Sequence, residues 1–308
     1  MAVRTYPRIG DMGSVDDEGN VLVTGACGHV GHEVCEILRS TGRPILPVDV
    51  DRDATKDLVL CDLTSKSEVS RLFHAHSIRA VIHLAGVLPS AFQSDPLGGA
   101  DVNLSGSFAL IRQAVDARVK RFVFASSMSV YGSSSPPRPL TEDDPAMPDE
   151  PYGASKRAVE VIGETLRNGT AFPFVALRIA RVVGPGIRKT SSPWRSQIFE
   201  LPGQLASIRI PFSPEATLSL VHVEDVARML ITLADTAAMN RFVYNTPAEI
   251  WKAKQLKHVL EELRGISVEL MEGGAQAGPI CDGSRFAREF GFRLRRLRDR
   301  LSDSIMSN

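Results

Sequence analysis

A tyrosine and a lysine stand four residues apart in the stretch YGASK, which begins at Tyr152 and ends at Lys156. One helical turn would place both side chains on the same face. A phenol with a reference pKa near ~10 is a poor base, but an adjacent ammonium favours its phenolate. Such a phenolate can take the proton of a substrate hydroxyl while hydride leaves the same carbon, and Ser127 would hydrogen-bond the developing carbonyl oxygen. The alternative is a surface pair on an amphipathic helix.

A second set of residues, TGACGHVG at 24–31, is suited to holding a pyrophosphate. Gly25 permits a tight turn, Gly28 lets the backbone approach the ligand, and Gly31 lets the following helix pack close to the sheet. The amino end of that helix offers unpaired N–H groups and a partial positive charge. Spaced glycines are also found as plain turn residues, so this pattern depends on its neighbours.

An acidic residue at the expected distance strengthens the dinucleotide interpretation. Asp49 lies 24 residues after Gly25 and would accept hydrogen bonds from the adenosine ribose hydroxyls. Its charge would repel a 2′-phosphate, which favours NAD over NADP, although Arg52 could reach such a phosphate. Asp62 would either accept from the adenine amino group or cap a helix. Gly86 would either let the chain pass near the cofactor or form a simple turn.

The elements around these residues follow a βαβ rhythm. Strands are predicted over 21–24, 45–50, 58–61, 80–85, 121–126 and 174–179, with helices over 30–39, 67–76, 98–117 and 154–167. The strands show little polar alternation, which is typical of parallel strands covered on both faces. The sequence therefore predicts an α/β fold, a Rossmann-type doubly wound parallel sheet, with a small C-terminal α/β substrate-binding part.

The predicted organisation has three parts: a flexible lead-in at 1–20, an NAD-binding domain at 21–183, and a substrate-binding part at 184–217 and 246–308. Residues 218–245 are expected to add to the sheet, with strands near 218–223 and 241–244 and a helix at 224–236. A helix at 252–264, a strand at 267–271 and an Arg-rich helical end complete the chain.

Composition narrows the function classes. The 308 residues carry 36 Lys plus Arg and 36 Asp plus Glu, a net charge of zero, so no field favours nucleic acid or a membrane surface. No apolar run approaches the roughly 20 residues of a spanning helix, and the start lacks a signal peptide's apolar middle, which favours a cytoplasmic protein. The four cysteines form no C-x-x-C pair, so free thiols and no metal site are expected.

Over residues 21–301 the chain resembles the extended short-chain dehydrogenase/reductases, the NAD-dependent epimerases and dehydratases. The resemblance is carried by TGACGHVG, Asp49, CDL at 61–63, HLAG at 83–86, Val102 with Asn103, SSMSVYG at 126–132, YGASK, Arg178 with VGP at 183–185, VHVEDVA at 221–227 and the stretch 282–292. It implies NAD as cofactor and a triad of Ser127, Tyr152 and Lys156. It also implies that Asn103 supports the lysine through water.

Two sets of site residues are expected from the motifs and the resemblance together. The cofactor-binding set is Gly25, Cys27, Gly28, His29, Val30, Gly31, Asp49, Asp62, Leu63, Leu84, Ala85, Gly86, Asn103, Tyr152, Lys156 and Ile179. The substrate-binding set is Ser127, Met128, Ser129, Tyr152, Arg181 and Arg188.

The resemblance also bears on the reaction. Met128 and Ser129 stand where dehydratases of this family carry an Asp-Glu pair as extra acid and base, and SMSVYG is closer to the UDP-glucose 4-epimerases. Arg181 and Val183 replace the usual Asn and Tyr, and LSL at 218–220 replaces an Arg-Asp pair whose arginine contacts a diphosphate. The main expectation is a sugar or nucleotide-sugar epimerase. The alternatives are a net dehydrogenase of a uronate, aldonate or threonine, and a non-catalytic dinucleotide sensor.

The expected partners are a small sugar or nucleotide-sugar substrate and a second copy of the chain. Arg181, Arg188, Lys189 or Arg195 could hold an anionic substrate, or each could be a loop charge or part of a structural ion pair. The family often dimerises through the helix that holds the tyrosine and the helix before it, which implies a homodimer. Neither nucleic acid nor a membrane is expected as a partner.

Overall fold

The structure is a computed structural model that describes residues 19–52, 57–133, 136, 138–186, 192–200, 203–274 and 277–306. Arg188 and Lys189, two of the candidate anion ligands, lie outside the described residues. Nearly all of the predicted lead-in at 1–20 lies outside them as well.

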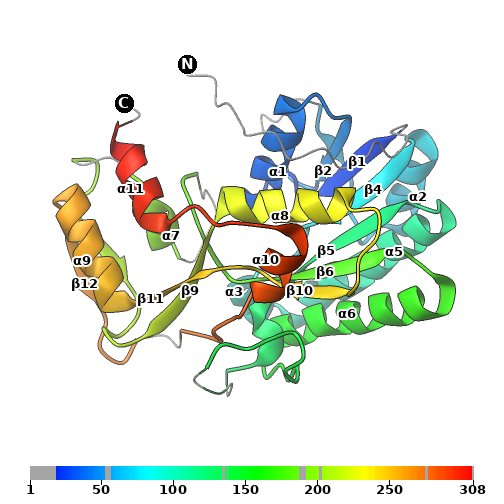
Figure 1. The fold of residues 1–308 in the computed structure, drawn as a ribbon. Coiled ribbons are helices and arrows are strands. Elements are labelled where there is room, and N and C mark those ends of the chain that lie inside the picture. The colour runs from blue at the N-terminus through cyan, green and yellow to red at the C-terminus, as the bar shows by residue number, and fades with distance from the viewer. Residues whose placement is uncertain are drawn as a thin grey trace.

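A seven-stranded sheet in the order β10-β6-β5-β4-β1-β2-β3 forms the centre of the larger part of the molecule (Figure 1). Every neighbouring pair is parallel. The strands are β1 (Asn20–Thr24), β2 (Ile45–Asp49), β3 (Val59–Leu60), β4 (Ile78–His83), β5 (Arg121–Ser127), β6 (Phe174–Ile179) and β10 (Val243–Asn245). The chain runs outward from β1 on one side and then returns to β4 on the other, so the switch point lies between β1 and β4. The predicted doubly wound fold is confirmed.

Helices cover both faces of this sheet and form two separate cores (Figure 1). One face carries α1 (His29–Ser40) and α8 (Val223–Asp235), and the other carries α2 (Lys66–Ala75), α5 (Ser107–Asp116) and α6 (Pro151–Thr170). The central strands are buried on both sides: all six residues of β4 are buried. This explains why the strands read as apolar runs without alternation.

The helix predicted at 98–117 is confirmed as a continuous helical stretch, but the prediction missed a π-helical turn within it. After α3 (Pro89–Ser94), the chain forms α4 (Pro96–Ala100), a π-helical stretch η1 (Asp101–Gly106) and then α5, one directly after the other. Asp95 starts α4 by accepting from the Gly98 backbone N–H at 3.0 Å, with Pro96 in the first turn. The wide turn η1 contains Asn103, a residue of the predicted site, and π-helical turns often occur at functional positions.

The C-terminal part is a separate lobe with its own core (Figure 1). Strand β9 (Thr217–His222), expected in the main sheet, instead lies between β7 (Arg181–Val183) and β11 (Glu249–Lys252), and only β10 extends the main sheet. A two-stranded sheet pairs β8 (Ser207–Ile210) with β12 (Ser267–Leu270). The helices here are α7 (Trp194–Gln197), α9 (Ala253–Arg264) and α11 (Leu297–Met306). In contrast, α10 (Ser284–Phe290) packs on β10, and its Phe286 is buried in a core of the main sheet. In the described part of residues 269–308, the helical residues are those of α10 and α11.

The structure also bears on the cysteines, on membrane-spanning helices and on metal-binding clusters. All four cysteines are free thiols, as predicted. Among the described residues there is no helix with the length and hydropathy to cross a membrane, and no cluster of His, Cys, Asp and Glu suited to a metal ion.

Candidate active site

The glycine turn between β1 and α1 is packed so closely that two of its glycines have no room for a side chain. Gly25 has φ +70°, and a Cβ there would lie 2.7 Å from the Ala85 backbone nitrogen. A Cβ on Gly31 would lie 2.0 Å from the Gly25 carbonyl oxygen. Gly28 differs, because only the Gly25 oxygen, at 3.1 Å, lies within 4 Å of its added Cβ. Gly28 therefore presents open backbone at the amino end of α1.

The amino end of α1 is suited to an anionic ligand. No side chain caps it at Gly28, and its first turn has no acidic residue. The N–H groups of that turn therefore remain available, together with the positive end of the helix dipole. This arrangement, with the open backbone at Gly28, fits the pyrophosphate of a dinucleotide. His29 lies here as well, and its buried Nε2 has no hydrogen-bond partner in the described part of the chain.

Asp49 ends β2 beside this turn and is held there by backbone N–H groups. Its Oδ2 accepts from the Cys27 nitrogen at 2.9 Å, and its Oδ1 accepts from the Val50 nitrogen at 2.8 Å. These bonds place the carboxylate where the ribose was expected. The geometry fits NAD.

The alternative that Asp62 caps the next helix is wrong. The residue at the start of α2 is Ser65, whose hydroxyl accepts from the Glu68 backbone N–H at 3.4 Å. The Asp62 Oδ1 instead accepts from the backbone N–H and the hydroxyl of Thr64, at 2.9 and 2.8 Å. Asp62 thus orders the turn after β3.

Tyr152 lies in the first turn of α6, which packs directly on the 3-10 helix η2 (Met128–Tyr131) after β5. Glu150 starts α6 by accepting from the Tyr152 backbone N–H at 2.9 Å. A Cβ on Gly153 would lie 2.4 Å from the Ser129 carbonyl oxygen, so only glycine allows this approach. This packing brings the Tyr152 side chain close enough to Ser127 for the serine hydroxyl to lower the pKa of the phenol.

Lys156 is buried one turn further along α6. Its Nζ donates to the Ala125 carbonyl oxygen at 2.9 Å and lies 5.7 Å from the centre of the Tyr152 ring. Burial lowers the pKa of Lys156 to about 8. Burial also raises the pKa of Tyr152 to about 12, while the bond from Ser127 and the positive charge of Arg195 act in the opposite direction.

This electrostatic balance differs from the expectation based on spacing. The sequence argument made the neighbouring ammonium the main influence on the phenol. In the structure the ammonium is held by the Ala125 carbonyl, and desolvation is the largest effect on Tyr152. At neutral pH the pair is therefore held as a neutral phenol beside an ammonium, so Tyr152 must lose its own proton before it can act as a base.

Asn103 of η1 connects the loop after β4 with α6. Its Oδ1 accepts from the Val87 backbone N–H at 2.7 Å, and its Nδ2 donates to the Val87 carbonyl at 3.1 Å and to the Ser155 hydroxyl at 3.4 Å. A Cβ on Gly86 would lie 3.0 Å from Asn103 Oδ1 and 3.6 Å from Lys156 Nζ. This close approach favours the first alternative for Gly86, in which it lets the chain pass through a crowded site.

The other expected cofactor residues lie at the same edge of the sheet. Ile179 pairs in register with Ser127 across β5 and β6. Val30, Leu84 and Ile179 are half-buried against one core, and Ala85 lies against the other. Leu63 is buried against the second core beside Gly106.

The expected substrate residues are more scattered. Met128 is buried, and the Ser129 backbone N–H donates to the Ser127 hydroxyl at 3.1 Å. Arg181 on β7 donates to the Ala277 carbonyl at 2.9 Å, in the neighbouring lobe. Arg188 cannot be placed, because it lies outside the described residues.

Glu160 is a site-supporting residue that the sequence argument missed. It is fully buried one turn after Lys156, and its two carboxylate oxygens accept from Arg178 at 3.0 and 2.8 Å. Oε1 also accepts from the Ser126 hydroxyl at 2.6 Å, and Arg178 donates to the Tyr131 hydroxyl at 2.9 Å. The network fixes α6 to β5 and β6 beneath the triad. An arginine within an apolar strand was the available signal, because a buried guanidinium needs a partner.

His83 was quoted only as part of a motif, yet it links the two strands at the switch point. Its ring nitrogens lie 2.7 Å from the Thr24 hydroxyl and 2.9 Å from the Ser107 hydroxyl. The Thr24 hydroxyl in turn accepts from the Leu84 and Ala85 backbone N–H groups at 3.3 Å. Burial lowers the pKa of His83 to about 3, so the ring is neutral.

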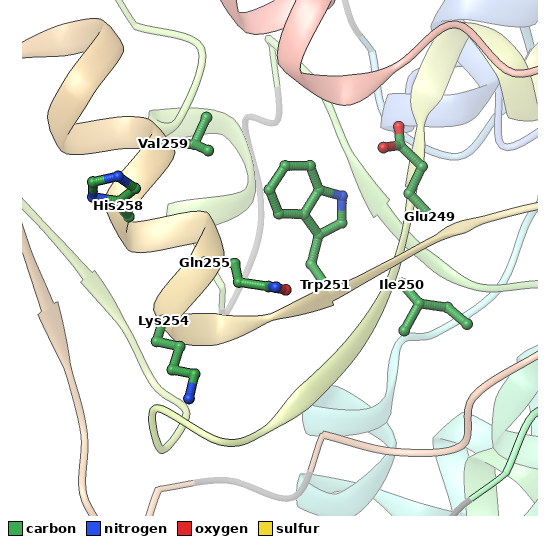
Figure 2. A pocket seen from close by; sticks show the side chains of 7 residues that line it. All are labelled: Glu249, Ile250, Trp251, Lys254, Gln255, His258 and Val259. Atoms are coloured by element: carbon green, nitrogen blue, oxygen red, sulfur yellow. The ribbon is translucent and has the colours of Figure 1, made fainter.

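A hollow of about 630 Å³ lies elsewhere, in the C-terminal lobe between β11 and α9 (Figure 2). Figure 2 shows the Trp251 indole between Glu249 and the side chains of α9. The described lining is Glu249, Ile250, Trp251, Lys254, Gln255, His258 and Val259. This lining includes none of the described cofactor or triad residues.

Known proteins share this fold and parts of this sequence. UDP-glucuronate 4-epimerase from Thermodesulfobacterium geofontis is 32% identical over 200 residues, 58% of this chain and only 60% of that protein's length. L-threonine dehydrogenase from Phytophthora infestans superposes with a TM-score of 0.85 at 17% identity, over 94% of this chain and 98% of that one. Thermus thermophilus UDP-glucose 4-epimerase in complex with NAD gives 0.79 at 23% identity, over 92% and 96%. These two structures establish the likeness of fold.

The family comparison covers the whole NAD-binding part. The model of the NAD dependent epimerase/dehydratase family matches residues 21–245, which include the glycine turn, Asp49 and the Tyr152 and Lys156 pair. The predicted resemblance, enzyme class and NAD cofactor are confirmed at this level. This chain belongs to the NAD dependent epimerase/dehydratase family.

Proposed function

We propose that this protein is an NAD-dependent oxidoreductase acting on a secondary alcohol of a sugar-type substrate, and that it works as a sugar or nucleotide-sugar epimerase. The observation that carries the proposal is the proximity of Tyr152 to Ser127 and to Lys156, whose Nζ lies 5.7 Å from the centre of the Tyr152 ring. This group lies at the sheet edge where the glycine turn opens. A protein that only binds a dinucleotide has no need of such a pair, which argues against the sensor alternative.

In this proposal each triad side chain acts at a stated atom. Bound NAD supplies a hydride acceptor at the carbinol carbon. Tyr152 acts as a phenolate and takes the proton of the substrate hydroxyl, and Ser127 donates a hydrogen bond to the same oxygen as it becomes a carbonyl. Lys156, anchored on the Ala125 carbonyl, and the positive nicotinamide would offset the negative charge that the phenolate carries before it takes that proton. Return of hydride to the other face of the ketone would complete an epimerisation with no further acid or base.

A net dehydrogenase is the second candidate, and one position favours it. Leu218 on β9 is fully buried in the core of the C-terminal lobe. It belongs to the stretch where the resemblance leads us to expect an arginine that contacts the diphosphate of a nucleotide sugar. A substrate without a diphosphate, such as a uronate, an aldonate or threonine, would not need that arginine.

One assay separates these candidates. Purified protein is incubated with NAD and with UDP-glucose, UDP-glucuronate, glucuronate, gluconate or L-threonine, and both absorbance at 340 nm and products are followed. A new sugar without net NADH supports epimerisation, whereas growing absorbance supports net oxidation. Binding of NAD without turnover of any substrate would contradict the epimerase proposal within this panel.

We also propose a cytoplasmic homodimer built on α5 and α6. Of the apolar residues on these helices, Leu110, Ile111 and Val159 are buried in the second core, whereas Phe108 and Ile162 are 36% and 42% exposed. The exposed pair is available for a partner. Sedimentation velocity of the wild type and of Ile162→Glu tests this, and a wild-type monomer at micromolar concentration would contradict it.

A further inference from the structure

Two arginines beside the triad carry charges that no described acidic side chain balances. Arg181 lies on β7 and Arg195 on α7, and the Nε of each is buried without a hydrogen-bond partner in the described part of the chain. Within the described residues, the Arg181 side chain donates to the Ala277 carbonyl at 2.9 Å, and its guanidinium lies 4.8 Å from the centre of the Phe212 ring. The described residues include no ion pair for either one. By contrast, the buried Arg178 faces Glu160 at 2.8 Å.

The position of Arg195 connects the two halves of the predicted site. Its backbone carbonyl accepts from the Gly184 N–H at 3.1 Å, and a Cβ on Gly184 would lie 3.3 Å from His29 Nε2. The charge of Arg195 acts on Tyr152, on His29 and on Arg181. The guanidinium therefore lies within electrostatic reach of both the glycine turn and the triad.

Two neighbouring cations taken partly out of water are costly unless an anion joins them. Burial and the repulsion from Arg195 lower the pKa of Arg181 to about 10, and burial lowers the pKa of Arg195. A carboxylate or phosphate between them would offset both effects and could accept charge-assisted hydrogen bonds from the two planar groups.

We propose that Arg181 and Arg195 form an oxyanion subsite that holds a carboxylate or phosphate group of the substrate beside Tyr152. This inference rests on the proposed function and adds the class of substrate, an alcohol that also carries an anionic group. Such a subsite would offset the loss of the family's diphosphate arginine on β9. Three anionic groups could bind the two arginines in the same way, and the experiment must distinguish them. They are a sugar carboxylate, a sugar phosphate and the pyrophosphate of the dinucleotide itself.

The test measures binding, so it does not depend on turnover. Isothermal titration of the NAD-saturated protein uses inorganic pyrophosphate, D-glucuronate and, as the neutral match, D-glucose. The variants are Arg195→Gln, Arg181→Gln and the charge-retaining Arg195→Lys. The control is Arg209→Gln, because Arg209 is 70% exposed and faces only Glu269 at 3.2 Å. Urea unfolding of each variant checks that it is folded.

We expect at least one anion to bind the wild type and to lose about tenfold or more in affinity in either Gln variant, with Arg195→Lys intermediate. If pyrophosphate binds and glucuronate does not, the group held in the subsite is a phosphate. If glucuronate binds and pyrophosphate does not, the group is a carboxylate. The affinity for NAD itself should stay within about twofold. Equal anion affinities in wild type and Gln variants would overturn the proposal, as would a loss confined to NAD. A Tyr152→Phe variant that still turns over substrate would refute the proposed function and leave the anion result standing.

Discussion

The tight packing of α1 on the glycine turn makes Gly31→Ala a sharp test of the cofactor site. The added Cβ would lie 2.0 Å from the Gly25 carbonyl oxygen and 2.9 Å from the Ala26 Cα. Ordinary contacts between such atoms are about 3.5 Å, so α1 must move by roughly 1.5 Å or the turn must deform. Both neighbouring atoms belong to the backbone, so no side chain can rotate away.

The expected cost follows from these distances. Overpacking usually costs roughly 1–3 kcal/mol, and we expect the upper end here, about 3 kcal/mol. Alanine in a helix regains about 1 kcal/mol relative to glycine, which leaves a net loss of about 2 kcal/mol in the free energy of unfolding. Because the shifted turn also carries the N–H groups at Gly28, the Kd for NAD should rise by at least about tenfold. Urea unfolding and a fluorescence titration with NAD measure the two effects.

The control is Gly169→Ala, near the end of α6. No atom lies within 4 Å of a Cβ added there. The same substitution should therefore raise the free energy of unfolding by up to about 1 kcal/mol and leave NAD binding unchanged. If Gly31→Ala behaves like Gly169→Ala in both measurements, the packing of α1 on the turn is not what the structure shows.

Three further predictions concern the triad, its support and pH. Tyr152→Phe should lower kcat by at least about a hundredfold while the Kd for NAD stays unchanged, and retained turnover would contradict its role as base. Glu160→Gln leaves the buried charge of Arg178 unpaired and should cost about 3–5 kcal/mol in urea unfolding, so a loss below about 1 kcal/mol would refute the network. Burial holds the pKa of His29 at about 4 and that of His83 at about 3, against an ordinary 6.5. The unfolded chain thus takes up protons that the folded chain does not, and the free energy of unfolding should fall as pH drops from 6.5 to 4, by up to about 1.4 kcal/mol per histidine and pH unit. A shallower slope in His83→Asn checks this, and an unchanged slope would refute it.

Local patterns predicted the NAD-binding half well because the chemistry there is local. Gly25, Gly28 and Gly31 lie on one turn, and that turn needs glycine for steric reasons that hold wherever it occurs. The apolar strands without polar alternation, separated by segments of helical periodicity, likewise indicate a parallel sheet that is covered on both faces. The site residues assigned from these motifs remain predictions, with a geometry that fits them.

The C-terminal lobe was harder because its order comes from pairing between distant segments. Strand β9 reads like a strand of the main sheet, but it pairs with β7 and β11 in a sheet of its own. Short strands such as β7 have only three residues, too few for a period to show. The helix expected at 98–117 does form, but the sequence did not predict its π-helical turn, which accompanies the interactions of Asn103 with Val87 and Ser155.

The amino-acid sequence by itself determined the class of the fold and the glycine turn after β1, and it supplied the candidates for proton transfer, because these follow from periodicity and from motifs that are short in the chain. Only the tertiary structure decided the partners of those residues. It showed Glu160 holding Arg178, the Ala125 carbonyl holding Lys156, and the buried Nε atoms of Arg181 and Arg195 without a hydrogen-bond partner among the described residues. The physical reason is that the burial and charge pairing of a residue depend on its neighbours in space. Those neighbours belong to segments that are far apart in the sequence.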